Sequence, residues 1–396
     1  MTEKLKPRSV FSRIHSLDLL RGFALLGILI MNIVSFSQVG SGYVNPTVGA
    51  GIEGYNAYFH AFAYLFADMR FMSVFSILFG AGVLLFAENA ERKGISVWKY
   101  HYKRMFFLLI FGFIHAYLIW MGDILVNYAI CGSLVFLMRK WKSKTLLIAS
   151  ILFFLVPTLL SFSTYFFMPQ EAQAETFAFY TPTSEETAQE ISSYTGSYME
   201  QMPFRIAGAI EMQTVLFLIE TFWRSMSMML LGMFLFKTNV LNAKREIGFY
   251  KKLIAFSFII GLSLSSIGLY RSYTHNWEGV WVMNIGHHYN YIASVFIALA
   301  YIGIVMIISK STGMYFFKMR MQAVGRMAFT NYIGTSILCT AIFYGHGLGL
   351  FGQFDRLQQW GVILLVWSII LIVSPIILSK YKQGPLEFIW RKLTYL

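Results

Sequence analysis

The chain has 396 residues, of which 57% are hydrophobic, 18% aromatic and only 13% charged, whereas a soluble domain carries about 25% charged residues. This composition excludes a soluble globular enzyme, a disordered chain and a disulfide scaffold. The formal net charge of +13 would suggest a nucleic-acid partner in a soluble protein, but here the basic residues lie in short segments between apolar runs, so we expect no nucleic acid. The sequence therefore predicts an all-α, polytopic membrane protein in contact with the lipid bilayer.

Apolar runs predict about ten transmembrane helices in a single integral membrane domain, residues 1–396. They are expected over residues 17–37, 65–87, 105–121, 124–138, 145–167, 209–236, 253–270, 290–309, 327–344 and 359–379. The third and fourth form a hairpin joined only by Gly122 and Asp123, and the count permits an inverted five-plus-five arrangement. The longest connection, about 168–208, is a candidate lid or amphipathic helix on the outer side.

The distribution of basic residues predicts the orientation. Of the 32 Lys and Arg, 26 lie in the segments 1–16, 88–104, 139–144, 237–252, 310–326 and 380–396, whereas the opposite loops hold only Arg205, Arg271 and Arg356. Because Lys and Arg concentrate on the cytoplasmic side, both termini are predicted to be cytoplasmic. Four basic residues precede the first span, which is predicted to be a signal anchor.

Ionisable residues inside spans are the default functional candidates, since each costs about 2.5–3.5 kcal/mol at mid-helix. Asp18 and Arg21 share a helix face and form either a local ion pair or a site that faces phosphate. Asp68 and Arg70 are two residues apart and cannot face each other on a helix, so each needs another partner. Arg70 is either buried or extended to the interface.

His115 lies eleven residues past Arg104, about 16 Å deep at 1.5 Å per residue, and so near the bilayer midplane. A His there is either bonded to a carbonyl or serves as a general base. Asp123 lies about 12 Å further along a straight helix, so it orients His115 only if the helix breaks, for example at Gly122. Otherwise Asp123 either faces substrate at the outer mouth or caps the next helix. Candidates to line the same cavity are Trp120, Asn127 and Tyr128.

The remaining motifs indicate little chemistry. His287 and His288 are adjacent and point about 100° apart on a helix, so we expect no metal site. The absence of G-x-S-x-G and G-x-x-x-x-G-K-[ST] argues against a serine hydrolase with an elbow and against an ATP-driven pump. G-x-G-x-x-G occurs at Gly49–Gly54 and Gly347–Gly352, but no strand precedes either copy.

Motifs spread along the whole chain carry a resemblance to a known family. They occupy residues 16–24, 26–29, 32, 43, 45–46, 75–82, 112–115, 120–125, 325–332, 343–344, 347–351 and 384–391. In combination they identify the chain as similar to the YeiB-like membrane proteins, a domain of unknown function numbered 418.

The opening Leu17-Asp18-x-x-Arg21-Gly22 stretch also resembles two wider groups, the membrane acyltransferases of cell-surface polysaccharides and the heparan glucosaminide acetyltransferases. That resemblance implies that cytoplasmic acyl-CoA, as co-substrate, acylates a sugar across the membrane with a buried His as base. In those relatives the His falls nearer the start of the second span, where this chain has His60, which is therefore a rival of His115.

We therefore expect transfer of an acyl group from acyl-CoA to an extracytoplasmic hydroxyl acceptor, such as a cell-surface glycan, in a bacterial plasma membrane and without a metal. The expected catalytic residues are His115 or His60 with Asp123; substrate-binding residues are Asp68, Arg70, Trp120, Asn127 and Tyr128; and residues for acyl-CoA are Asp18, Arg21, Arg104, Arg326 and Asn331. Arg326 and Asn331 also suit simple packing. The alternatives are a small-molecule transporter and a lipid-binding or scaffolding protein without turnover.

Overall fold

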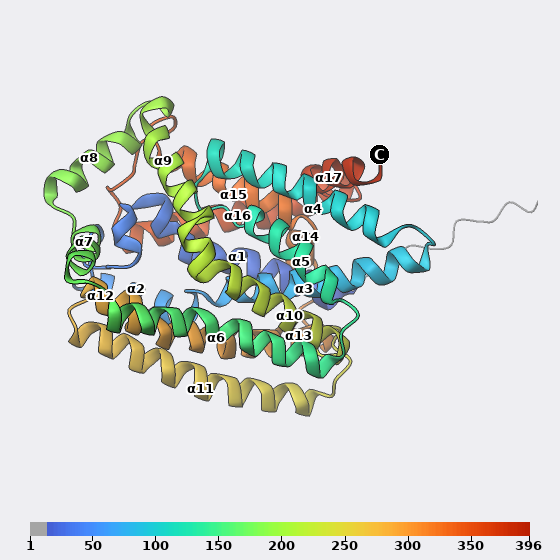
Figure 1. Ribbon diagram of the computed structural model, residues 1–396. Coiled ribbons are helices and arrows are strands. Elements are labelled where there is room, and N and C mark those ends of the chain that lie inside the picture. The colour runs from blue at the N-terminus through green and yellow to red at the C-terminus, as the bar shows by residue number, and fades with distance from the viewer. Residues whose placement is uncertain (1–13) are drawn as a thin grey trace, which may run out of the picture.

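The computed structural model describes residues 14–396, and this range consists of helices and connecting turns without a strand. The predicted basic cluster at the N-terminus, Lys4, Lys6, Arg8 and Arg13, lies outside the described residues. Long helices run side by side along one axis of the molecule (Figure 1). They are α1 (His15–Ser37), α3 (Arg70–Arg92), α4 (Val97–Ile114), α6 (Ser143–Phe167), α10 (Phe222–Lys237), α11 (Ile247–Thr274), α13 (His287–Lys310) and α16 (Arg356–Lys380).

Shorter helices connect and cover these. They are η1 (Gly40–Tyr43), α2 (Tyr55–Phe66), α5 (Leu125–Val135), η3 (Phe136–Met138), α7 (Gln170–Tyr180), α8 (Ser184–Thr195), α9 (Tyr198–Gln213), α12 (Gly279–Trp281), α14 (Tyr315–Arg326), α15 (Ala328–Phe343) and α17 (Pro385–Tyr395). There are three π-helical turns in residues 14–396. η2 (His115–Ile119) ends the helical stretch that α4 begins, and η4 (Phe217–Thr221) and η5 (Val282–Gly286) interrupt longer helices.

Eight helical stretches in residues 14–396 are long and apolar enough to cross a membrane. The predicted spans 124–138 and 327–344 correspond to two shorter apolar helices, Leu125–Met138 and Ala328–Phe343, which fall short of the roughly 20 residues that a full crossing needs. Outward-facing Leu152 and Leu159 of α6 are 60% and 65% exposed, as expected of side chains that face lipid. The protein is therefore an α-helical membrane protein.

The bundle has two distinct ends. The C-terminus, α17 and the turn between α3 and α4 lie at one end in Figure 1. There Lys237 donates to the carbonyls of Arg139 and Trp141, and Arg326 donates to the carbonyl of Lys382. We call it the basic end. The opposite end, the cap end, carries α7, α8 and α12. The predicted loop 168–208 thus folds into α7, α8 and the start of α9. Capping boxes at Thr183 and Ser197 begin α8 and α9.

Glycines at two helix contacts let the two backbones approach each other closely. A Cβ atom on Gly22 of α1 would lie 2.0 Å from the carbonyl oxygen of Met321 in α14, and one on Gly80 of α3 would lie 1.9 Å from that of Met229 in α10. Small residues at such contacts are typical of membrane helices, which gain little from the hydrophobic effect between them. These contacts hold α1, α3, α10 and α14 together around the polar sites described next.

Candidate functional site

A hydrogen-bonded trio of Asp123, His115 and Ser336 lies buried where η2, α5 and α15 meet. His115 Nδ1 is 2.8 Å from Asp123 Oδ1, and His115 Nε2 is 2.9 Å from Ser336 Oγ. The side chains of His115 and Asp123 are 0% and 1% exposed, and Ser336 is buried. When Nδ1–H donates to the carboxylate, Nε2 is the basic nitrogen, and it faces a hydroxyl. This is the arrangement of a general base with an orienting acid.

His115 and Asp123 meet because the helix breaks between them. From His115 the chain forms the π turn η2, and Trp120 is extended at φ −159° and ψ 130°. The chain then reverses and α5 begins at Leu125. The sequence required a helix break near Gly122 for His115 and Asp123 to meet, and the structure has this break. Asp123 also caps α5, because its Oδ2 accepts the N–H of Val126 at 2.7 Å, so the two alternatives for Asp123 hold together.

Two aromatic side chains lie against the trio. The ring of Tyr332 has its centroid 5.0 Å from that of His115, and its hydroxyl accepts the N–H of Ile124 at 3.3 Å. The ring of Trp120 stacks on Phe36 of α1 at 4.0 Å between centroids. The indole Nε1 of Trp120 is buried and has no hydrogen-bond partner within residues 14–396. The predicted substrate residue Trp120 thus lies beside the trio with a free donor.

A cavity of about 300 Å³ runs from the basic end toward the trio. Its lining includes the three arginines that the sequence proposed for acyl-CoA, Arg21, Arg104 and Arg326. Apolar side chains such as Leu78 and Leu108 line its length, and it reaches Ile124, Tyr128 and Tyr332, which border the trio. Tyr332 therefore lines the cavity and also contacts the ring of His115.

The other predicted residues for acyl-CoA have neighbours of their own. Asp18 is buried and pairs with Arg21 at 3.0 Å, and Asn331 donates to Ser374 Oγ at 2.9 Å and to the carbonyl of Val324 at 3.2 Å. Neither is part of the cavity lining. Asp18 therefore holds Arg21 in position. Asn331 instead joins α15 to α14 and α16.

The predicted substrate residues Asn127 and Tyr128 point to different neighbours. Tyr128 lines the cavity and hydrogen-bonds Ser76 at 2.8 Å between hydroxyl oxygens. Asn127 instead donates to Ser225 Oγ of α10 at 2.8 Å, and so ties α5 to α10. Adjacent helix positions point about 100° apart, which is why both cannot face one cavity.

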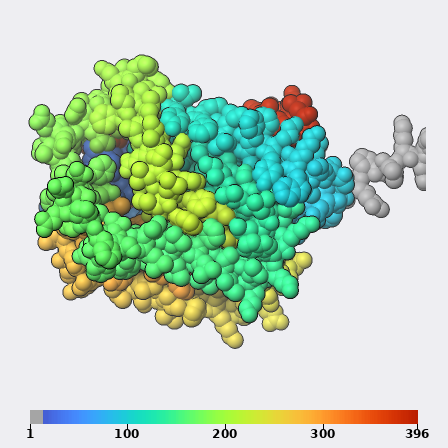
Figure 2. All heavy atoms as spheres, viewed as in Figure 1, coloured from blue at the N-terminus to red at the C-terminus, as the bar shows by residue number. Residues whose placement is uncertain are grey.

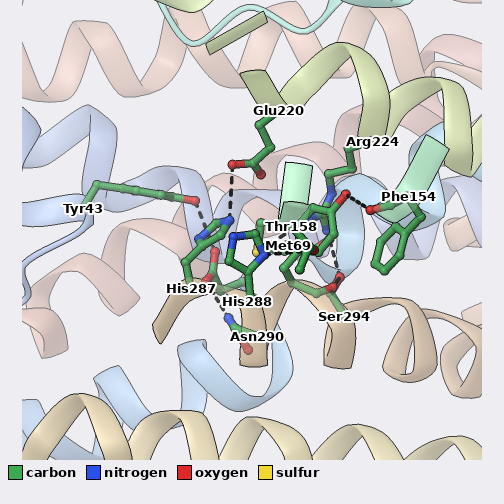
Figure 3. Close-up of polar contacts among 12 residues, drawn as sticks. Tyr43, Met69, Phe154, Thr158, Glu220, Arg224, His287, His288, Asn290 and Ser294 are labelled. Atoms are coloured by element: carbon green, nitrogen blue, oxygen red, sulfur yellow. Dashed lines mark hydrogen bonds and ion pairs between the residues drawn. The ribbon is translucent and has the colours of Figure 1, made fainter. Parts of the chain in front are cut away.

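A second polar cluster, partly buried, lies toward the cap end (Figure 3), built around the interrupted helices α2–α3, η4–α10 and η5–α13. His287 Nε2 lies 3.2 Å from Glu220 Oε2. Asp68 accepts hydrogen bonds from the hydroxyl of Tyr43 at 3.2 Å and from Asn290 Nδ2 at 2.7 Å. This cluster holds the predicted substrate residue Asp68 but does not include the trio.

Two buried arginines complete this cluster. Arg70 donates to the backbone carbonyl of Asp68 and to Ser265 Oγ, so it is buried rather than extended to the interface. Arg224 donates to the carbonyl of Met69 at 3.0 Å and to Ser294 Oγ at 2.8 Å, as Figure 3 shows. Met69 has a positive φ of 63°, and this break between α2 and α3 exposes its carbonyl to Arg224.

The rival base His60 lies apart from the trio, on α2. Its ring centroid is 5.0 Å from that of Trp277 and 6.0 Å from that of Tyr64, and its Nδ1 has no hydrogen-bond partner within residues 14–396. No carboxylate orients it in that range. Of the two histidines, His115 therefore has the geometry of a positioned base.

Ser336 and Glu220 are among the site residues that the sequence did not predict. Ser336 is one of several hydroxyl residues in α15, and only its contact with His115 distinguishes it. Glu220 lies inside the predicted span 209–236, and a carboxyl group within that run was the signal that could have revealed it. No group of three or more His, Cys, Asp or Glu in the described part of the chain could hold a metal ion.

Known proteins match the chain over nearly its whole length. It is 31% identical to "Uncharacterized protein YxaH" of Bacillus subtilis (strain 168), with 99% of this chain and 96% of that protein covered. It is 28% identical to "Uncharacterized protein YeiB" of Escherichia coli (strain K12), with 96% and 95% covered. The sequence model of the family described as "Protein of unknown function (DUF418)" matches residues 235–396. The chain therefore belongs to the YeiB-like DUF418 family of membrane proteins.

Proposed function

We propose that the protein is a membrane acyltransferase that moves an acyl group from acyl-CoA at the basic end to a hydroxyl acceptor from the cap end. One observation carries the proposal: a single cavity connects Arg21, Arg104 and Arg326 to Tyr332, which borders His115. A ligand that fits this cavity has an anionic head and an apolar extension, as acyl-CoA has. Arginine forks suit its phosphates.

The orientation follows from the charges. Because Lys and Arg favour the cytoplasmic side, the basic end faces the cytoplasm, where acyl-CoA is made, and all ten apolar segments contribute to the membrane domain. The partly exposed Arg21 is anchored by Asp18 at 3.0 Å. Arg104 lies between the rings of Phe86 and Trp390, 4.6 Å from each centroid. The arginines are thus held in place before the ligand arrives.

His115 supplies the base. Asp123 holds Nδ1–H, so Nε2 takes the proton of the acceptor hydroxyl while its oxygen attacks the thioester carbonyl carbon. The carbon–sulfur bond breaks, and the CoA thiolate receives the proton from His115. The products are an ester and free CoA. The acceptor hydroxyl takes the place that Ser336 Oγ occupies at 2.9 Å from Nε2.

Binding and turnover test the proposal separately. We expect purified protein to bind labelled acyl-CoA saturably, and Arg21→Gln and Arg326→Gln to weaken binding roughly tenfold each, as loss of a charge-assisted hydrogen bond predicts. Arg271→Gln is the matched control, because Arg271 is exposed and does not line the cavity. His115→Gln should leave binding intact and lower release of free CoA about 10²–10⁴-fold. Unchanged turnover in His115→Gln, or equal binding in all three arginine variants, would contradict the proposal.

The second cluster favours one alternative, a transporter. Asp68, Glu220 and His287 lie where helices are interrupted, and charged residues at broken helices are typical of transport sites. Glu220→Gln would then abolish substrate-driven proton uptake into vesicles and leave acyl-CoA binding unchanged. Loss of turnover in His115→Gln with no such uptake would exclude the transporter.

A further inference from the structure

Arg205, on α9, is fully buried, and its guanidinium has no hydrogen-bond partner within residues 14–396. Its Nε, Nη1 and Nη2 atoms all lack one. Its contact is the face of the Tyr198 ring, whose centroid lies 4.9 Å from Cζ. Burying an unpaired charge is costly, so a purely structural role does not explain the unpaired guanidinium of Arg205.

The other buried arginines of the cap half show what a structural guanidinium looks like here. Arg70 and Arg224 each donate to a backbone carbonyl and a serine hydroxyl. Arg356 donates to the carbonyls of Gly51 and Pro46. Arg205 differs from all three, because none of its donors is used. The fold thus gives each of these three guanidinium groups at least two hydrogen-bond acceptors.

A second unused donor is connected to Arg205 through two aromatic rings. The Tyr198 ring that contacts Arg205 is 5.8 Å from the ring of His346, and that ring is 5.9 Å from the ring of Tyr344. The hydroxyl of Tyr344 is buried and has no hydrogen-bond partner in the described chain. The two open groups of this aromatic cluster are therefore a guanidinium and a phenol, both of which can donate to an anion.

No acidic residue of the described chain neutralises Arg205. Glu190 of α8 approaches the same region, but its Oε1 accepts the N–H of Gly40 at 2.9 Å, and no ion pair joins it to Arg205. The charge of Arg205 is thus available to a ligand.

This position adjoins the proposed base. Along α9, Tyr198 donates to the carbonyl of Leu118 at 2.8 Å, and a Cβ atom on Gly208 would lie 2.3 Å from Met121 Sδ. Arg205 lies between these two contacts, so it faces the segment that joins His115 to Asp123. At the cap end, Figure 2 shows a hollow beside α9 that is open between α7 and α8.

We propose that Arg205 and Tyr344 form an anion subsite that binds the carboxylate or phosphate group of the acceptor. The inference rests on the proposed acyl transfer and names its acceptor class: a hydroxyl compound with an oxyanion, whether a soluble phosphate ester or the headgroup of an anionic lipid. The guanidinium forms a fork with two oxygens, and the phenol donates to one oxygen. The hydroxyl of the same molecule then extends toward His115.

Thermal unfolding of the full-length protein in nanodiscs tests the subsite without turnover. In phosphatidylcholine discs, glycerol 1-phosphate should raise the unfolding temperature, because a ligand that binds only the folded state stabilises it. Glycerol serves as the neutral control. In a second experiment the unfolding temperature is measured in phosphatidylglycerol discs instead of phosphatidylcholine discs. Comparison of the two experiments distinguishes a lipid headgroup from a free ester as the ligand. Arg205→Gln should weaken the response about tenfold to a hundredfold in ligand concentration, and Tyr344→Phe about fivefold to tenfold.

The stability without anion gives an independent readout. Because an unpaired buried charge is removed, Arg205→Gln should unfold at a higher temperature than the wild type in neutral discs, whereas loss of a structural residue would lower it. Arg271→Gln should change neither value. The subsite is overturned if neither anion stabilises the wild type, or if Arg205→Gln keeps the response. If Arg205→Gln fails to fold, Tyr344→Phe decides in the same way. An anion response that depends on Arg205, in a protein that does not bind acyl-CoA, would keep the subsite and refute the acyl transfer.

Discussion

Asp123 serves two neighbours at once: Oδ1 contacts His115 Nδ1 and Oδ2 accepts the amide of Val126. One oxygen therefore contacts the proposed base and the other caps the helix. Asn is as good a cap as Asp, but its amide cannot stabilise a charged imidazole.

We expect Asp123→Asn to lower CoA release about 10²–10⁴-fold while thermal stability changes little. Asp123→Ala should lose both, with a further cost of about 1 kcal/mol from the missing cap. The comparison of turnover with unfolding temperature in the two variants checks this. Equal turnover in wild type and Asp123→Asn would show that His115 needs no carboxylate.

A surface carboxyl gives a prediction for pH. The hydrogen bond from Tyr55, at 2.6 Å, and then the backbone N–H of Gln358, hold the pKa of Asp355 below its ordinary value. A carboxyl with a lower pKa in the folded state adds stability above its unfolded pKa, and that stability is lost as pH falls through the folded pKa. We expect the loss to begin near pH 4.

Unfolding of the wild type and Asp355→Asn between pH 3 and pH 7 tests this. Asn keeps the cap of α16 but does not titrate, so the difference between the two proteins should be largest at pH 7. Because Asp355 is partly exposed, the difference should stay below about 1 kcal/mol. A difference that grows as pH falls would have the wrong sign.

At the scale of elements, the sequence predicted helices better than their interruptions. Hydropathy runs show where apolar residues continue. The π turns at His115–Ile119, Phe217–Thr221 and Val282–Gly286 each need only one extra residue per turn, which leaves the hydropathy unchanged. For the same reason the contact of His115 with Ser336, which are 221 residues apart, had no local signal. By contrast, Arg21, Arg104 and Arg326 could be grouped from the sequence, because each begins or ends a span at the same side.

Helix contacts give a matched pair of glycine substitutions on α3. A Cβ atom on Gly80 would meet the backbone of Met229, whereas one on Gly82 would meet nothing within 4 Å. Gly80→Ala should therefore destabilise the protein by about 1–3 kcal/mol, as overpacking does, and Gly82→Ala should not. Unfolding temperatures in one detergent compare them directly. Similar values for both variants would show that α3 and α10 can separate at little cost.

For the whole molecule, the charge distribution predicts which end faces the cytoplasm. Cys131 and Cys339 are buried, so single cysteines can be added without removing them. Ser184→Cys on α8 should react with an impermeant maleimide in intact cells, and Lys382→Cys should react only after the membrane is opened. The reverse pattern would place the arginine-lined cavity outside and remove its access to cytoplasmic acyl-CoA.

The cover formed by α17 has a practical consequence for handling this protein. Trp390 donates to the carbonyl of Arg104 at 3.0 Å, Glu387 accepts the N–H of Phe329 at 2.8 Å, and the ring of Tyr395 is 5.1 Å from that of Tyr100. The last helix therefore forms the rim of the arginine-lined cavity. A purification tag fused after Leu396 would sit at that rim and compete with the incoming ligand, so tags belong elsewhere, or must be cleaved before any binding assay.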